Sequence, residues 1–357
     1  MYDIIIIGAG PSGSTLSRML DKNHNILLVD KRNMSENEPY KSEKCCGGLL
    51  APDAQKALAQ LGLGVPKEVL TGPQMFSVKA IDFDNKIERF YSRDYINIDR
   101  EKFDRWLVSL VPDSVEVKFN CLFNSYNIFN DYIEVKLRTN GKEHIVRTKI
   151  LVGADGAISR IRSQMFKDNV VPQKYIAIQE SYKTNYEMPY YTSIFDKNTT
   201  DFYSWIIQKE NSLLVGSAIP IKRNANKRYR QLINKLKKQG TIKGKAIKRT
   251  GTLIMRTRND KQIHALKGNI AFVGEAAGFI SPSSAEGISY ALRSGAMLAN
   301  SINEDRNNFG QIYLKKIKLI RINLFLKNIK VHIIYNSFLR HIIMKSKILS
   351  MSIKDIY

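Results

Sequence analysis

The sequence predicts an α/β fold, in which a doubly wound, Rossmann-like nucleotide-binding domain carries an antiparallel sheet (an α+β insert) and a helical C-terminal tail. Runs typical of buried strands recur at 4–7, 149–152 and 269–273, and each leads directly into a glycine-rich turn. Segments with the alternation of antiparallel strands lie between these turns. From residue 311 onward the pattern is helical, apolar and basic.

The N-terminal segment predicts a dinucleotide site. Four consecutive isoleucines indicate a strand buried on both faces, and the strand runs into a Gly-x-Gly-x-x-Gly turn. The turn consists of Gly8, Ala9, Gly10, Pro11, Ser12 and Gly13. Such glycines permit the tight turn, the approach of a pyrophosphate and close packing of strand and helix. The helix expected at 14–20 presents free N–H groups and the positive end of its dipole to the phosphate.

A second strand, expected at 26–29, strengthens this interpretation. It ends in Asp30, where an acid hydrogen-bonds a ribose hydroxyl in dinucleotide sites, and Lys31 follows. A glycine-rich turn of some other α/β fold is the alternative.

Composition bounds the class of protein. The chain has 357 residues, 43% hydrophobic and 25% charged, which is ordinary for a globular protein of one large domain or two joined ones. It lacks a run of apolar residues long enough to cross a membrane, and no signal peptide is expected because the first motif begins almost at residue 1. Only Cys45, Cys46 and Cys121 are present, so neither disulfides nor a metal site is expected. A cytoplasmic location is predicted.

The formal net charge of +23 suggests an anionic partner. Nucleic acid, anionic lipid and an acidic protein are the candidates, although a compositional bias toward Lys, Ile and Asn also raises the charge. The sequence contains no zinc-finger or RNP motif, so nucleic acid is not expected.

The segments after the first motif alternate between helix and strand. Asp99 is the expected N-cap of a helix, and Asn140-Gly141 is an expected hairpin turn. Helices are predicted at 52–61, 100–110, 225–238 and 288–302. Strands are predicted at 75–83, 86–92, 95–98, 115–119, 132–138, 144–149, 175–182, 190–195, 202–207 and 213–219.

Two further glycine motifs follow buried strands. The second contains Gly153, Ala154, Asp155, Gly156, Ser159 and Arg162. The third contains Gly274, Glu275, Ala276, Ala277 and Gly278 and continues to Pro282, Glu286, Gly287 and Ile288. Three such motifs are too many for simple NAD binding.

Together the motifs resemble the flavoproteins with the p-hydroxybenzoate-hydroxylase fold. The resemblance covers roughly residues 1 to 300 and implies that the first motif holds the pyrophosphate of FAD. It also implies that Arg100, Asp155 and Gly156 contact FAD, and that Gly274, Glu275, Ala276, Gly287 and Ile288 lie beside its pyrophosphate, ribityl chain and ring. Glu275 stands where this family usually has Asp, so its side chain is one methylene longer.

A finer resemblance is to geranylgeranyl reductases and digeranylgeranylglycerophospholipid reductases. Lys44-Cys45-Cys46-Gly47-Gly48 is similar to their Lys-x-Cys-Gly-Gly segment, which implies that Cys46, Gly47 and Gly48 lie near the flavin ring. Tyr203-Ser204-Trp205-Ile206-Ile207-Gln208-Lys209 resembles their Tyr-x-Trp-x-Phe-Pro-Lys, but Ile207 and Gln208 depart from it. Tyr203, Trp205 and Pro282 are the implied substrate contacts.

The implied reaction is reduction of carbon–carbon double bonds in an isoprenoid chain or isoprenoid lipid by hydride transfer from reduced FAD. Cys46 and Tyr203 are the candidate proton donors, since cysteine has an ordinary pKa of about 8.5 and is protonated at neutral pH. NAD(P)H or an acidic ferredoxin or flavodoxin is the expected electron donor.

Other interpretations remain open. The chain could be an FAD monooxygenase or halogenase that uses a flavin hydroperoxide, or a flavoprotein that binds an isoprenoid lipid without turnover. Cys46 could serve packing alone, and the same holds for Tyr203 and Trp205, which point to one face of their strand. Lys209 is more typical of a solvated lysine.

The domain boundaries follow from these motifs. The FAD-binding domain is expected at 1–73, 99–172 and 262–302, the substrate-binding sheet at 74–98 and 173–261, and a basic helical tail at 303–357. Residues 311–357 contain eight Lys and two Arg against Asp355 alone, and Leu319, Ile322, Leu326, Ile329 and Ile333 can share one helical face. The tail could pack on the domain or contact an anionic membrane surface, peripherally on its inner face.

Overall fold

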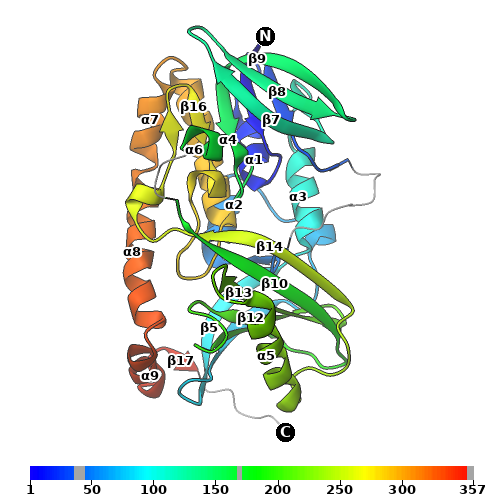
Figure 1. The fold of residues 1–357 in the computed structure, drawn as a ribbon, viewed down its shortest axis with the longest axis vertical. Coiled ribbons are helices and arrows are strands. Elements are labelled where there is room, and N and C mark those ends of the chain that lie inside the picture. The colour runs from blue at the N-terminus through cyan, green and yellow to red at the C-terminus, as the bar shows by residue number, and fades with distance from the viewer. Residues whose placement is uncertain (36–44, 167–170, 352–357) are drawn as a thin grey trace.

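Two β-sheets, one above the other in Figure 1, form the framework of the protein, and helices run along their flanks. This computed structural model describes residues 1–35, 45–166 and 171–351. Lys44, part of the expected cysteine segment, lies outside the described residues.

The first sheet contains the parallel strands that the glycine motifs predicted. Its order is β15-β16-β9-β1-β2-β6, and β16, β9, β1, β2 and β6 run parallel. β8 pairs antiparallel with β9, and β7 pairs with β8. The strands are β1 (Tyr2–Ile7), β2 (Ile26–Val29), β6 (Val115–Lys118), β7 (Cys121–Ile128), β8 (Ile133–Thr139), β9 (Lys142–Gly153), β15 (Leu266–Lys267) and β16 (Ile270–Phe272).

The second sheet is mainly antiparallel, in the order β14-β10-β13-β12-β11-β4-β5-β17, and β3 pairs with β5. The pair β11 and β4 is parallel. The strands are β3 (Leu49–Leu50), β4 (Met75–Asp82), β5 (Ile87–Asn97), β10 (Gln173–Lys183), β11 (Tyr190–Phe195), β12 (Ser204–Lys209), β13 (Ser212–Pro220), β14 (Lys248–Arg256) and β17 (Ser350–Met351).

Several strand predictions need correction. The segments expected at 86–92 and 95–98 form one continuous strand, β5, because the polar residues between them alternate with its inward-facing side chains. Likewise 144–149 and 149–152 are parts of the single strand β9. The strands β7 and β14 were not predicted.

Proline and a polar side chain begin two of the helices. Pro11 opens α1 earlier than predicted, since proline fits the first helical turn, and the Asp99 carboxylate caps α3 by accepting from the N–H groups of Glu101 and Lys102. The helices are α1 (Pro11–Met19), α2 (Pro52–Gln60), α3 (Arg100–Ser109), α4 (Arg160–Met165), α5 (Ala225–Lys238), α6 (Ile288–Glu304), α7 (Phe309–Lys316), α8 (Lys318–Ile334) and α9 (Ser337–Lys345).

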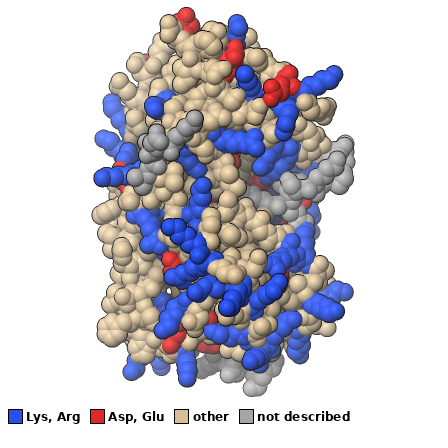
Figure 2. Space-filling view, viewed as in Figure 1, with Lys and Arg blue, Asp and Glu red and all other residues tan. Residues whose placement is uncertain are grey.

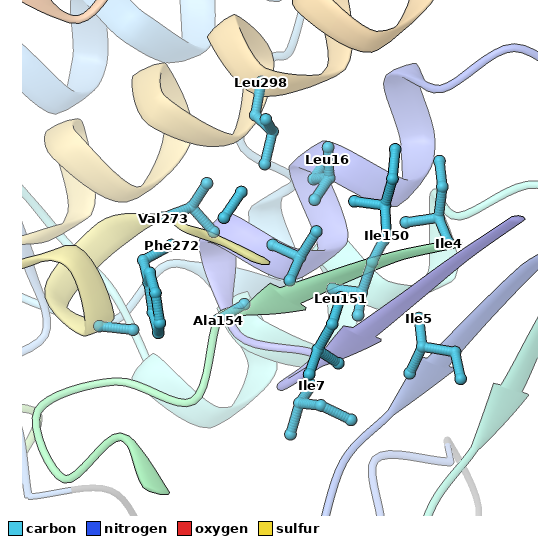
Figure 3. Close-up of a cluster of buried hydrophobic side chains, with 14 of the residues drawn as sticks. Ile4, Ile5, Ile7, Leu16, Ile150, Leu151, Ala154, Phe272, Val273 and Leu298 are labelled. Carbon is cyan, nitrogen blue, oxygen red and sulfur yellow. The ribbon is translucent and has the colours of Figure 1, made fainter. Parts of the chain in front are cut away.

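The core of the upper half lies between the parallel sheet and the pair α1 and α6. Figure 3 shows Leu16 of α1 and Leu298 of α6 beside the apolar side chains of β1 and β9. Ile4 and Leu151 are fully buried there, as expected for strands covered on both faces. Burial of each such side chain stabilises the fold by about 1.5–3 kcal/mol.

The tail differs in part from the helical segment that the sequence predicted. α7, α8 and α9 run down one side of both sheets, but Ser350–Met351 forms the edge strand β17 on β5 (Figure 1). Arg340 of α9 is buried and forms a bidentate ion pair with Asp82 of β4, at 2.6 and 3.1 Å. No helix among the described residues is long and apolar enough to cross a bilayer.

Candidate active site

The turn between β1 and α1 has the geometry of a pyrophosphate cradle. Gly8 has a φ of +111°, and a Cβ on Gly13 would lie 1.8 Å from the carbonyl oxygen of Gly8. Both glycines are therefore required by close backbone packing. A Cβ on Gly10 would meet nothing within 4 Å, so this glycine borders open space at the N-terminus of α1. Pro11 and Ser12 are buried in the first turn of the helix.

Asp30 lies beside this turn, at the end of β2, but its carboxylate is already engaged. It accepts hydrogen bonds from the backbone N–H of Ala9 and from three nitrogens of Arg32. These occupy the four acceptor positions of a carboxylate, so a ribose hydroxyl would have to displace one donor. Lys31, the neighbouring predicted residue, is exposed.

The second glycine motif lies next to the first. The N–H of Ala154 donates to the carbonyl of Ile7, which aligns the ends of β9 and β1. Asp155 accepts from the N–H of Arg160 through one oxygen, and burial raises the pKa of its carboxyl. Gly156 has a φ of +76° and open space at its Cβ position.

Arg162 ties the second motif to the third. This buried guanidinium donates to the carbonyl oxygens of Glu275 and Ala276, at 3.0 and 2.7 Å. Gly274 has a φ of +57°, and a Cβ there would lie 3.0 Å from the Ser12 hydroxyl of the first motif. The three glycine motifs therefore meet at one place, although they are far apart in the sequence.

The third motif leads to the N-terminus of α6. Gly287 is the N-cap of this helix, and Ile288, the first helical residue, is buried. The Glu275 carboxylate accepts from the N–H of Met255, at 3.3 Å. The free N–H groups at the start of α6 can bind an electronegative edge of a ligand.

These residues fit FAD. The second carboxylate oxygen of Asp155 is buried without a hydrogen-bond partner within the described structure, as expected where a ligand hydroxyl is to bind. Cβ positions of Gly10, Gly156 and Gly287 all face open space. Pyrophosphate would lie on the first motif, with the ribityl chain near Asp155 and Glu275 and the flavin ring near α6.

Cys46 lies at the end of a buried ionic network. Its sulfur is 3.4 Å from the Arg100 guanidinium and 3.4 Å from the N–H of Gly48. Asp104 accepts from Arg100 at 2.7 Å and from Arg32 at 3.2 Å. Because Arg32 also binds Asp30, the network extends from the nucleotide turn to Cys46.

The surroundings of the two adjacent cysteines differ. Cys46 lies beside the cationic guanidinium of Arg100. Burial raises the pKa of the Cys45 thiol to about 11, so Cys45 is protonated. The Cys45 thiol approaches the carbonyl oxygen of Ala177 at 3.8 Å.

Lys209 is half-buried and held by hydrogen bonds, whereas its residue type is more typical of a solvated lysine. Its ammonium group donates to the carbonyl oxygens of Gly48 and Ile98, at 2.9 and 2.8 Å, and to the side-chain oxygen of Asn97 at 2.5 Å. Burial lowers the pKa of Lys209 to about 7, although Cys46 acts in the opposite direction. Lys209 thereby fixes the backbone around Gly47 and Gly48.

An apolar, largely aromatic cluster adjoins the cysteine segment. We call it the aromatic cluster. Cys45 and Leu49 flank Cys46, Gly47 and Gly48 and pack against it. Its buried members include Met75, Tyr175, Ala177, Tyr191, Phe202, Trp205, Ile207 and Ala218, and Tyr95, Tyr203 and Tyr335 pack against them.

The predicted substrate residues lie in or beside this cluster. The Tyr203 hydroxyl donates to the carbonyl of Ser284 at 2.6 Å, and its ring lies 5.6 Å from that of Trp205. Burial raises the pKa of Tyr203, which keeps its hydroxyl protonated. The carbonyl of Pro282 accepts from Arg256. The indole N–H of Trp205 is buried without a partner in the described structure.

Glu286 is a site residue to which the sequence assigned no role. One of its carboxyl oxygens is buried without a partner within the described residues, and burial raises the pKa of the group. Ala285, the residue before it, packs against the aromatic cluster, so Glu286 lies close to this cluster. Its position immediately before Gly287 was the available sequence signal.

The fold and this site define an FAD-dependent oxidoreductase, with a Rossmann-like nucleotide domain and a second sheet beside the flavin end. The family model described as "FAD binding domain" matches residues 1–305, and the chain belongs to this family. "Protein CbrA" of Escherichia coli K12 is 37% identical over 345 residues, which cover 97% of this chain. The same-named protein of Escherichia coli O139:H28 is 38% identical, and the match covers 96% of it.

Solved structures share the fold. A geranylgeranyl bacteriochlorophyll reductase-like protein from Thermoplasma acidophilum superposes with a TM-score of 0.83 at 20% identity, covering 99% of this chain and 93% of that one. PqsL, a probable FAD-dependent monooxygenase from Pseudomonas aeruginosa, gives 0.71 at 16% identity, covering 97% and 98% of the two chains. A reductase-like protein and a probable monooxygenase thus share this architecture.

Proposed function

We propose that the protein reduces carbon–carbon double bonds of an isoprenoid chain or isoprenoid lipid. The observation that carries this proposal is the contact between the cysteine segment and the aromatic cluster. The side chains of this cluster are mostly apolar, which suits contact with a hydrocarbon chain. The reductase-like Thermoplasma acidophilum structure agrees with the proposal by analogy of fold.

The protein's part in such a reaction is positioning and proton supply. Bound, reduced FAD supplies a hydride to one alkene carbon, and a proton must reach the other carbon. Glu286 meets the requirements for that donor: its pKa is raised by burial and one oxygen is free of protein partners in the described structure. Tyr203 holds the loop before Glu286 through Ser284, and the Arg100 guanidinium contacts the Cys46 sulfur.

The alternative chemistry of a halogenase is less well supported. A lysine that carries an oxidised halogen needs a free nitrogen lone pair. Lys209 is the lysine at the cysteine segment, and three oxygens within hydrogen-bond distance of its Nζ hold it against the backbone. Its role is therefore to shape the backbone.

An anaerobic half-reaction tests the proposed function. The FAD-loaded protein would be reduced with dithionite and mixed with geranylgeranyl diphosphate, while flavin absorbance and product mass are followed. We expect flavin reoxidation together with a product heavier by two hydrogens per reduced bond. Reoxidation only after air is admitted would contradict the proposal and favour oxygen chemistry. If the protein retains the lipid but its flavin is not reoxidised, a flavoprotein that binds the lipid without turnover would be favoured.

The electron donor is a separate part of this proposal. NAD(P)H or an acidic ferredoxin or flavodoxin would re-reduce the flavin, and the net charge of +23 favours docking of an acidic protein. Stopped-flow reduction by each donor under nitrogen would distinguish them.

A further inference from the structure

The outer side of α8 and α9 is an unusually large apolar surface. Of the 25 exposed large hydrophobic residues among those described, 14 lie between 314 and 351. We call the main group the tail face. It consists of Leu319, Ile322, Phe325, Leu326, Ile329, Ile333, Phe338, Leu339, Ile342, Ile343, Ile348 and Leu349. The left edge of Figure 2, where α8 runs in Figure 1, is largely free of charged side chains.

The orientation of these helices is fixed by their inner side. Ile320, Leu324 and Val331 of α8 are buried, while Phe325 is 64% exposed. On α9, Phe338 is 71% exposed, whereas Arg340 is buried against Asp82. The tail face is therefore the side that remains after both helices have packed on the protein, and a surface of this kind marks an interaction site.

Charge defines the kind of partner. The sequence contains no Asp or Glu between Asp305 and Asp355. Lys315, Lys318, Lys330, Lys345 and Lys347 are exposed, and none of them has an ion-pair partner within the described residues. Exposed apolar residues flanked by lysines are typical of helices that lie in the interface of an anionic membrane.

We propose that α8 and α9 dock the protein onto an anionic lipid bilayer through the tail face. The apolar side chains would enter the boundary between headgroups and acyl chains, and the flanking lysines would contact anionic headgroups. A second copy of the chain fits less well, because a symmetric dimer through this surface would bring two cationic rims together. This inference does not depend on the proposed reaction.

Vesicle sedimentation of the full, FAD-loaded chain tests the proposal. We expect the protein to sediment with vesicles that contain phosphatidylglycerol, and much less with vesicles of phosphatidylcholine alone. Added NaCl should weaken the binding, because salt screens the lysines. Replacing Ile322, Phe325 and Ile329 together by Ser should lower the partition coefficient by about tenfold or more, because large apolar side chains then no longer enter the interface.

A matched variant controls for the loss of exposed apolar residues in general. Phe76, Ile128 and Ile145 are 66%, 61% and 55% exposed on β4, β7 and β9. Their joint replacement by Ser should leave vesicle binding unchanged. Both triple variants should retain the FAD spectrum and far-ultraviolet circular dichroism of the parent protein.

Three results would overturn the proposal. One is the absence of binding to anionic vesicles by the parent protein. Another is equal binding by the two triple variants. The third is a dimer in sedimentation equilibrium that the tail-face variant, but not the control variant, converts to a monomer. That result would assign the surface to a second copy of the chain.

Discussion

Two carboxyl groups with opposite environments mark the two ends of the site. At the nucleotide end, the carboxylate of Asp30 accepts hydrogen bonds from Arg32 and Ala9. At the other end, Glu286 has one buried oxygen without a partner in the described structure, and burial raises its pKa. The first carboxylate can order structure, while the second can hold a proton.

Glu286→Gln should slow the anaerobic reoxidation of the flavin by an isoprenoid by about 10²–10⁴-fold, the usual contribution of a general acid. The acid must be protonated, so the rate of the parent protein should fall as pH rises through the pKa of Glu286, which lies above the ordinary value of 4.5. Stopped-flow absorbance at several pH values measures both effects. Glu304→Gln, a change on the surface of α6, should leave the rate unchanged. An unaltered rate and pH profile in Glu286→Gln would exclude this role.

Substitutions at two glycines of the first turn should separate an effect on stability from an effect on FAD binding. In Gly13→Ala the new Cβ would lie 1.8 Å from a backbone oxygen, so we expect FAD-free protein to lose stability in urea unfolding. In Gly10→Ala the Cβ enters open space, so the stability of FAD-free protein should be unchanged while FAD binding weakens. Fluorescence titration with FAD measures the second effect. Equal stability of the two variants would contradict this reading of the turn.

At the scale of whole elements, local sequence patterns predicted the parallel strands well. They failed for strands whose formation depends on long-range contacts. The four isoleucines of β1 are buried on both faces, as their sequence indicated. β7 was missed because a register shift between Phe123 and Ser125 interrupts its alternation. β14 was missed because it begins with exposed charged residues and contains Gly251.

In the candidate site, too, local motifs could be predicted from the sequence, whereas contacts between distant residues could not. The family resemblance implied that the three glycine turns lie around one cofactor, and a finer resemblance pointed to Cys46. No local signal could show that Arg100, Asp104 and Arg32 form one buried network, because its members come from separate elements. For the same reason the sequence could not predict the hydrogen bonds that hold Lys209.

Buried ion pairs of Arg340 with Asp82 and Asp84 attach α9 to the second sheet. Arg340→Met should lower the free energy of unfolding by about 3–5 kcal/mol, because it leaves Asp82 buried without its counter-charge. Urea unfolding measures the change. Arg321→Gln, which removes the exposed pair with Asp260, should cost at most about 1 kcal/mol. If both variants lose a similar free energy of unfolding, the burial of Arg340 does not make its ion pair more stabilising than an exposed one.

The ion pair of Arg340 with Asp82 also predicts a response to acid. Burial acts to raise the pKa of Asp82, but hydrogen bonds from Arg340 and Asn85 outweigh it and lower the pKa below 3.8. The stabilisation is therefore present above the unfolded-state pKa and is lost as pH falls through the folded-state pKa. Unfolding measured between neutral pH and strong acid should show this loss in the parent protein and a smaller one in Arg340→Met.

At the scale of the whole molecule, distant parts of the chain form a single unit. The residues predicted to hold FAD come from 8–30, 100–162 and 274–288, and the tail packs against the second sheet through Arg340. Positive side chains gather over the lower half of the face in Figure 2. Distant segments of the chain thus pack into one interior, while the surface carries a strong net positive charge.

Salt should have opposite effects on folding and on membrane binding. A net charge of +23 places the native state under self-repulsion, which salt screens over a Debye length of about 10 Å at 0.1 M. The free energy of unfolding should therefore rise with NaCl in the dilute range, while binding to anionic vesicles falls. Urea unfolding of FAD-saturated protein, run beside vesicle sedimentation in the same buffers, compares the two. If the free energy of unfolding instead falls with NaCl, attractive ion pairs outweigh the repulsion between like charges. The control variant at Phe76, Ile128 and Ile145 would then be needed to separate loss of vesicle binding from unfolding.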